Sequence, residues 1–278
     1  MPDTVAERPV GTRGRVRAEL AVGSALLAVW VVASLAAPWI APYDPAALDF
    51  MAPLAAPSPA HWLGTDQLGR DVLSRVLHGG RDVLLVAPAA SLVGTVSGAA
   101  LGLAAVWGGR WVDEAIMRVL DAVMAAPLVV LAMLVLSLLG PGRGNVVLVV
   151  GFVFAPLVAR TVRAAALPLV QAGYVEAARL RGEGAAVILA AEILPNIARV
   201  VLVEGTLRVG YAVFTAATLG FLGLGAQPPS PDWGLMVAEN RAFLTTAPWT
   251  VLVPALAVAL VVVGFSLVAD GLSAGEER

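Results

Sequence analysis

The chain has 278 residues, of which 59% are hydrophobic and only 14% charged, with a formal net charge of −2. It contains no cysteine, which excludes disulfides and thiolate chemistry. All 18 basic residues are arginines, so the chain lacks the lysine that a P-loop or a Schiff base requires. The two histidines, His61 and His78, are too few and too far apart for a metal site built by this chain alone.

Six apolar runs dominate the sequence, and its mean hydropathy is +0.85. Each run approaches the ~20 residues that a helix needs to cross ~30 Å of hydrocarbon. Backbone polar groups in lipid must be satisfied internally, so we interpret these runs as helices. The sequence therefore predicts an all-α membrane protein with six transmembrane helices, at about 20–41, 82–106, 115–139, 145–167, 198–225 and 248–270.

The first 19 residues are polar and carry Arg8, Arg13, Arg15 and Arg17. The apolar run after them exceeds the ~7–15 residues of a signal-peptide core, so it predicts a first span rather than a cleaved signal. Its arginines place the N-terminus in the cytoplasm. An even number of spans then returns the C-terminus to the cytoplasm. The loops 107–114 and 168–197 are expected inside, and 42–81, 140–144 and 226–247 outside.

The segment that follows the first span is charged. Asp66 precedes Arg70 by four residues and Asp71 precedes Arg75 by four, which predicts two ion pairs on one helix face. We expect an amphipathic surface helix after an N-terminal turn. It serves either as a brace between the first two spans or as a functional outer surface. Its candidate residues are Gly64, Thr65, Asp66, Gly69, Arg70, Asp71, Ser74 and Arg75.

Two further patterns lie within the spans or beside them. Gly94, Gly98 and Gly102 recur at helical spacing, which is typical of closely packed membrane helices, either within one bundle or between subunits. The Pro-rich stretch "AQPPSPDWG" (226–234) predicts a rigid outer lid or re-entrant loop, with Trp233 at the membrane interface.

Ionisable residues inside spans are candidates for function. Arg118 and Asp121 are three apart on the third span, and Glu204 and Arg208 are four apart on the fifth. Each set predicts either a neutralised structural pair or a contact along a translocation path. In an ion-coupled transporter, Glu204, Arg208 and Asp121 would form a proton relay.

A charged, alanine-rich island, "YVEAARLRGEGAAVILAAEILPN" (174–196), separates the fourth and fifth spans. Glu176 lies on a short predicted helix that Gly182 and Gly184 break. Pro195 suits the first turn of the next span because it has no N–H to donate. The pattern predicts two short helices, roughly perpendicular, at the cytoplasmic face, where small alanines let a partner approach.

This island resembles the EAA loop of bacterial ABC importer permeases, in which Glu-Ala-Ala precedes a Gly and a later Leu-Pro. The matching residues are Glu176, Ala177, Ala178, Gly182, Leu194 and Pro195. The resemblance implies a type I importer permease fold whose coupling loop docks into a groove of the ATPase subunit. Segments 61–81, 108–127, 221–234 and 269–272 resemble the C-type subunit of the dipeptide/oligopeptide/nickel subfamily.

The resemblance implies a multi-pass bacterial inner-membrane subunit that is not itself an enzyme and binds no cofactor. Its expected partners are a second homologous permease, two ATPase subunits that bind ATP and Mg, an extracytoplasmic substrate-binding protein and membrane lipid, but no nucleic acid. The outer segment 64–75 would then seat the binding protein or seal the outer mouth.

Di- or oligopeptides are the expected cargo, with nickel chelates, glutathione or another small solute as alternatives. The expected organisation is a cytoplasmic tail (1–19), a first span with the outer segment (20–81), a five-helix core containing the loop 174–196 (82–272), and a tail (273–278).

Overall fold

The computed structural model describes residues 11–273 as a helical bundle, with side chains described from residue 17. The predicted tails 1–19 and 273–278 therefore lie largely outside the described residues. The helices are α1 (Gly11–Ile40), α2 (Val72–Trp107), α3 (Gly109–Met124), α4 (Leu128–Leu139), α5 (Arg143–Ala166), α6 (Gly173–Leu180), α7 (Ala185–Val187), α8 (Leu194–Phe221), α9 (Trp233–Asn240) and α10 (Trp249–Ser273).

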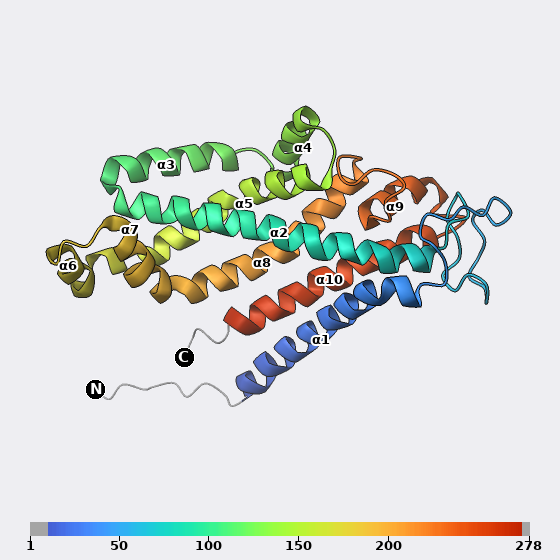
Figure 1. Ribbon diagram of the computed structural model, residues 1–278, viewed down its shortest axis with the longest axis horizontal. Helices are drawn as coiled ribbons and strands as arrows, with labels where there is room; N and C mark the ends of the chain where they lie inside the picture. The colour runs from blue at the N-terminus through green and yellow to red at the C-terminus, as the bar shows by residue number, and fades with distance from the viewer. Residues whose placement is uncertain (1–10, 274–278) are drawn as a thin grey trace.

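The predicted all-α membrane fold is confirmed. Five helical segments are long and apolar enough to cross a membrane, and the bent pair α3–α4 makes a sixth if it counts as one span. Figure 1 shows the long helices running side by side along the molecule. The start of α1 and the end of α10 point toward the end that carries α6 and α7, whereas α9 and the 41–71 connection lie at the opposite end. We call these the α6 end and the α9 end.

The glycine stripe of α2 packs within the bundle, against α5. A Cβ on Gly94 would lie 2.8 Å from the carbonyl oxygen of Gly151, and on Gly98 or Gly102 it would lie 2.6 Å from that of Ala155 or Ala159. Both series advance by four residues, so the two helices run parallel in close contact along one ridge. Of the two predicted roles for the stripe, the structure supports packing within one bundle.

The second span begins ten residues earlier than predicted. Helix α2 starts at Val72, so residues 72–81 form its first turns and are not a separate surface helix. The carboxylate of Asp71 caps this helix, accepting a hydrogen bond from the backbone N–H of Ser74 at 2.8 Å. The apolar run that predicted this span begins only after the first turns, because these turns carry Arg75, His78 and Arg81.

The third predicted span, 115–139, is not one straight helix. Helices α3 and α4 meet at 88° across residues 125–127. Pro127 disfavours helical geometry in the residue before it, and its own ψ of 128° ends the α-helical path. Apolar content predicted a continuous span, but the local effect of this proline divides it.

Candidate functional site

The predicted loop at 174–196 contains one separate helix and the beginning of another. Helix α6 ends just before Gly182, whose φ of +81° favours glycine. The second short helix was predicted to stand apart, and this is wrong. Residues 185–187 continue through a π-helical turn (Ile188–Ile193) into α8, as one helical segment from Ala185 to Phe221. Pro195 lies in the first turn of α8, as predicted.

One face of this loop is anchored in an apolar cluster. Val175 and Ala178 of α6 are fully buried, as are Ile188 and Ile193 of the second segment. They pack with residues of α5 and α8, namely Val158, Val162, Ala166 and Ile197. The guanidinium of Arg179 lies 4.5 Å from the ring centroid of Trp107, at the end of α2, a cation–π contact. Helix α6 therefore shares an apolar cluster with α5 and α8 and contacts the end of α2.

The other face of the loop is exposed. Glu176 and Ala177 point to the surface, and Glu176 has no ion-pair partner among residues 17–273. Leu180 is 84% exposed and Val187 53%. Arg181 donates a hydrogen bond to Glu183 at 2.7 Å within the same surface. An anchored short helix that presents a free acid beside bare leucine and valine side chains has the chemistry of a protein-docking surface.

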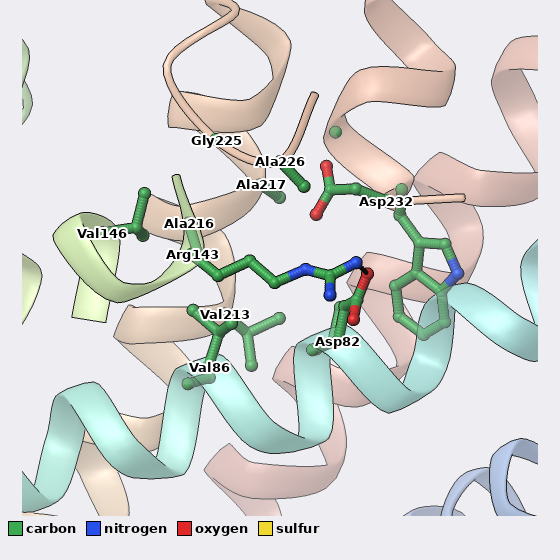
Figure 2. Close-up of a pocket in the computed structure, with 14 residues that line it drawn as sticks. Asp82, Val86, Arg143, Val146, Val213, Ala216, Ala217, Gly225, Ala226 and Asp232 are labelled. Atoms are coloured by element: carbon green, nitrogen blue, oxygen red, sulfur yellow. Dashed lines mark hydrogen bonds and ion pairs between the residues drawn. The ribbon is translucent and has the colours of Figure 1, made fainter. Parts of the chain in front are cut away.

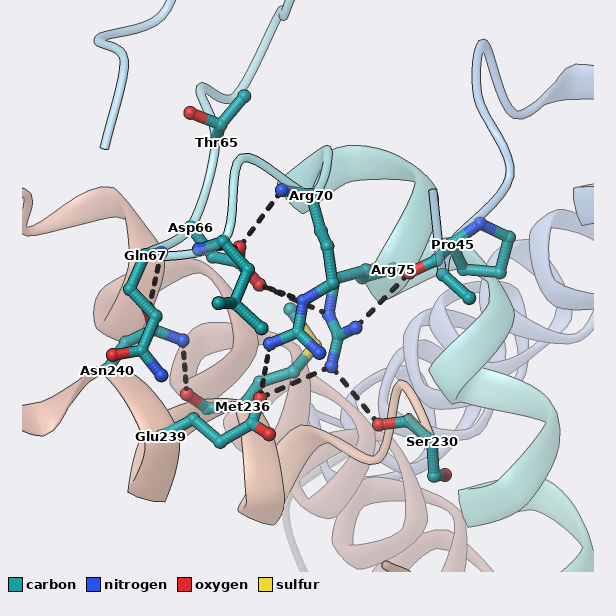
Figure 3. Close-up of polar contacts among 12 residues, drawn as sticks. Pro45, Thr65, Asp66, Gln67, Arg70, Arg75, Ser230, Met236, Glu239 and Asn240 are labelled. Carbon is teal, nitrogen blue, oxygen red and sulfur yellow. Dashed lines mark hydrogen bonds and ion pairs between the residues drawn. The ribbon is translucent and has the colours of Figure 1, made fainter. Parts of the chain in front are cut away.

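At the α9 end, a buried cluster joins two distant parts of the chain (Figure 3). The outer ion cluster consists of Asp66, Arg70, Arg75 and Glu239. Arg70 binds the carboxylates of Asp66 and Glu239, each at 2.6 Å. Arg75 lies 3.8 Å from Asp66 and 3.6 Å from Glu239, and its side chain is 0% exposed. Two buried arginines are thus balanced by two carboxylates.

Backbone groups also bind Arg75, which donates to the carbonyl oxygens of Pro45 at 3.2 Å and Ser230 at 3.1 Å. Its Nε has no hydrogen-bond partner among the described residues. The predicted Asp66–Arg70 pair forms, but across a turn before α2 and not on a helix face. The predicted Asp71–Arg75 pair is wrong, because Asp71 caps α2 and lies 3.0 Å from Nδ1 of His61. Asp71 lies before the helix, so the four-residue spacing does not place it on a shared helix face.

The rest of the predicted segment also contacts residues far along the chain. Trp249 donates from Nε1 to the carbonyl oxygen of Thr65 at 3.2 Å. A Cβ at Gly64 would lie 2.6 Å from that same indole nitrogen, and a Cβ at Gly69 would overlap the carbonyl of Asp49. Ser74 is buried and bonds the carboxylate of Asp71. These residues brace the segment, and their close approaches require glycine.

Trp233 was predicted at the membrane interface, and the structure corrects this. Its side chain is buried, and its Nε1 donates to the carbonyl oxygen of Val76 at 3.0 Å. Sequence reasoning also missed Glu239 and Asn240. No local pattern marks them, since Glu239 lies 169 positions from Arg70 and pairs with it only in the fold.

A small cavity of about 20 Å³ lies beside the same region, roughly large enough for one water (Figure 2). Arg143, at the start of α5, binds Asp82 of α2 at 2.6 Å. Asp232 caps α9 by accepting from the backbone N–H of Leu235 at 2.9 Å. Burial raises the pKa of Asp232 to about 6, with the charge of Asp82 adding to the shift.

The intramembrane pairs are only partly as predicted. Arg208 binds Glu204 at 2.6 Å, and Glu204 is buried. The predicted Arg118–Asp121 pair is wrong. Arg118 binds Glu114, its neighbour one turn back, and Asp121 binds Arg160 of α5. Arg118 and Asp121 do not meet because Asp121 faces α5. Asp113 faces the same helix and binds Arg163 at 2.5 Å.

Comparison with known sequences identifies the class and then the family. Residues 94–275 match the family described as the binding-protein-dependent transport system inner membrane component. The chain belongs to this family of membrane transport permeases, and it is a multi-pass inner-membrane component rather than an enzyme. Membership implies ATPase and binding-protein partners.

Individual relatives cover nearly the whole chain. The chain is 38% identical to the dipeptide transport system permease protein DppC of Alkalihalophilus pseudofirmus, over 90% of this chain and 83% of the relative. It is 40% identical to the glutathione transport system permease protein GsiD of Pectobacterium atrosepticum, over 92% and 86%. It is also 40% identical to the probable D,D-dipeptide transport system permease protein DdpC of Escherichia coli, over 91% and 85%. The chain is therefore an ABC permease of the dipeptide/glutathione transport family.

Proposed function

We propose that this permease imports short peptides, forms half of a translocation path with a second homologous permease, and couples to two ATPase subunits through residues 174–196. The α6 end would face the cytoplasm, and the α9 end the substrate-binding protein. The observation that carries the coupling role is the exposed face of α6, with Glu176 and Leu180 free for a partner while Val175 and Ala178 are anchored.

The coupling would proceed through rigid connections. ATP binding closes the ATPase pair and displaces α6, and the anchor formed by Val175 and Ala178 passes this displacement to α5. Residues Ala185–Phe221 form one helical segment, so a force at Ala185 also moves α8 directly. Gly182 separates α6 from the segment Ala185–Phe221, and its conformational freedom lets the angle between them change. Hydrolysis then resets the path, with no covalent step at any residue of this chain.

The orientation is supported by position. Arg17 lies in the first turns of α1, where the candidate span begins. The start of α1 points toward the end that carries α6 (Figure 1), and arginines at span ends favour the cytoplasmic side. Under this orientation the outer ion cluster holds residues 64–75 as a rigid platform beneath the docked binding protein. That platform would also keep the outer mouth closed until the binding protein arrives.

Peptide cargo is supported by the relatives, which are named for dipeptides, D,D-dipeptides and glutathione at similar identity. Their named substrates share amide groups and charged ends. The Glu204–Arg208 pair would offer both charges to a zwitterion, if it opens toward the path. Nickel chelates and other small solutes are the competing cargo.

The coupling role is tested by co-purification with the subunits encoded beside this gene. Glu176→Arg should abolish recovery of the ATPase subunits, because it reverses the free acid on α6. Asp44→Arg is the matched control, since Asp44 is an exposed acid at the α9 end. Equal ATPase recovery from both variants and the wild type would refute the coupling role.

Cargo is tested by uptake into vesicles that contain the complete transporter and its binding protein. Labelled dipeptide should accumulate with ATP, and glutathione or nickel should compete weakly. Accumulation driven by a proton gradient without ATP would instead support an ion-coupled transporter. The structure offers little for that alternative, because Asp121 pairs with Arg160 and not with Glu204 or Arg208.

A further inference from the structure

A groove of about 480 Å³ lies between α8, α9 and α10. This volume falls within the ~300–1,000 Å³ that is usual for ligand pockets. The lining side chains are apolar, apart from one hydroxyl and one indole N–H. The hydroxyl of Thr218 donates to the carbonyl oxygen of Phe214 at 2.8 Å, and Nε1 of Trp233 donates to that of Val76. The side chains that line the groove therefore offer no free polar group to a ligand.

The groove runs along the helices that form it. Its lining extends from Phe214 to Phe221 on α8 and from Ala255 to Val263 on α10. These stretches cover 7 (221 − 214) and 8 (263 − 255) positions, or roughly 11 and 12 Å along each helix. Phe221 ends α8 beside α9 (Figure 1). A molecule in the groove would therefore lie parallel to the spans, with one end at the α9 end of the molecule.

A cation stands at that end of the groove. Arg241 directly follows α9, and its guanidinium lies 5.7 Å from the ring centroid of Phe221, a lining residue. The arginine is exposed, and it has no carboxylate partner among residues 17–273. A guanidinium is well suited to bind a phosphate through paired hydrogen bonds. The groove thus combines an apolar interior with an unpaired cation at its outer end.

The size and chemistry of the groove select among possible occupants. A helix is ~10 Å across with its side chains, so ~12 Å of helix would fill on the order of 900 Å³. That is about twice the 480 Å³ of the groove, so a helix of another subunit does not fit inside it. A polar solute would lose its hydration without gaining hydrogen bonds from the lining side chains. A flexible hydrocarbon chain matches the lining, and an anionic group at the end of that chain matches Arg241.

We propose that the groove between α8, α9 and α10 is a binding site for an anionic phospholipid. One acyl chain occupies the groove, and Arg241 binds the phosphate, with the ring of Phe221 holding the guanidinium in place. The lipid would connect the short helix α9 to the two spans. This site is independent of the cargo, the subunit partners and the orientation proposed above.

Native mass spectrometry of the purified transporter complex tests the site. The probes are phosphatidylglycerol and phosphatidylethanolamine with identical chains, supplied in equal amounts. Arg241→Gln removes the cation, and Arg118→Gln is its control, since Arg118 is 77% exposed on α3. Ala259→Trp fills the groove from an exposed position. Its control is Leu252→Trp, because Leu252 is 57% exposed on the same helix but does not line the groove.

The wild type and both controls should retain phosphatidylglycerol in preference to phosphatidylethanolamine. Arg241→Gln should weaken phosphatidylglycerol retention by roughly tenfold, the loss expected for one hydrogen bond to a charged group. Ala259→Trp should reduce retention of both lipids. Because Arg241 is exposed, Arg241→Gln should assemble as the wild type does, and it decides the test if Ala259→Trp fails to assemble.

Three results would overturn the inference. The first is equal retention of the two lipids by the wild type, and the second is unchanged phosphatidylglycerol retention in Arg241→Gln. The third is loss of another subunit from Ala259→Trp with unchanged lipid retention, because the groove would then be a contact between proteins.

Discussion

The two ends of the molecule differ in the environment of their charged clusters, which are buried at the α9 end and exposed at the α6 end. At the α9 end, Asp66, Arg70 and Arg75 are buried, and the two arginines pair with Asp66 and Glu239. At the α6 end, Glu176 has no ion-pair partner within the part of the chain that the structure describes, and Arg181 forms exposed pairs. Buried charges are stable only in one arrangement, whereas exposed charges can exchange partners at little cost. The α9 end is therefore fixed by its own residues, whereas the exposed charges at the α6 end can exchange partners.

The largest effect should come from breaking the outer ion cluster. Arg75→Ala removes a buried cation and leaves Asp66 and Glu239 undercompensated, which should destabilise the protein by about 3–5 kcal/mol. Thermal unfolding in detergent measures this loss. Arg181→Ala is the matched control at the α6 end and should change stability by less than about 0.5 kcal/mol. Similar losses from both variants would remove the distinction between the two ends.

The α9 end should also respond to pH through Asp232. Its pKa is raised from 3.8 to about 6, so the folded protein binds a proton more tightly than the unfolded chain does. The resulting stabilisation is fully present below pH ~4 and is lost as pH rises to ~6, by on the order of 3 kcal/mol. Unfolding temperatures of the wild type between pH 4 and 7 report the change.

Asp232→Asn is the control for this pH dependence, because asparagine also caps helices but does not titrate. Subtracting its pH profile from that of the wild type isolates the contribution of Asp232. A difference that stays constant between pH 4 and 7 would contradict the raised pKa.

A smaller effect is expected where α3 binds α5 near the α6 end. Asp113 and Arg163 are partly exposed, so their coupling should be about 0.5–1 kcal/mol. A double-mutant cycle with Asp113→Asn and Arg163→Gln measures it by unfolding. The coupling free energy from this cycle should be much smaller than the stability lost in Arg75→Ala. An equal value would show that the difference in exposure does not distinguish the ion pairs of the two ends.

The smallest effect on stability should come from the surface of α6 itself. Leu180→Ser removes an 84% exposed leucine and should change unfolding by less than about 0.5 kcal/mol. ATPase recovery should nevertheless fall, since the leucine would be buried only in the complex. Ala178→Ser is the comparison variant on the anchored face. Because Ala178 is buried, this substitution should lower the free energy of unfolding. Unchanged ATPase recovery with Leu180→Ser would mean that α6 does not dock through this side chain.

Local patterns in the sequence predicted much of this arrangement. Glu204 and Arg208 are four apart on α8 and pair as the helical spacing predicts, whereas Asp66 and Arg70 pair across a turn outside any helix. The same rule failed for Asp71–Arg75 because a helix start lies between them, and three-residue spacing failed for Arg118–Asp121 because each found another partner. Spacing gives the face of a helix that a residue occupies, but not where the helix begins or what lies opposite.

The sequence by itself determined the class of the protein, the approximate spans and the charged island, because apolar length, helical period and glycine conformation are local properties. Only the tertiary structure decided that Glu239 balances Arg70 and Arg75, and that residues 185–193 of the loop continue into α8. Each of these depends on which surfaces meet across more than a hundred residues of chain, or on whether a helix continues past a local break. Neither is a property of any short stretch of sequence.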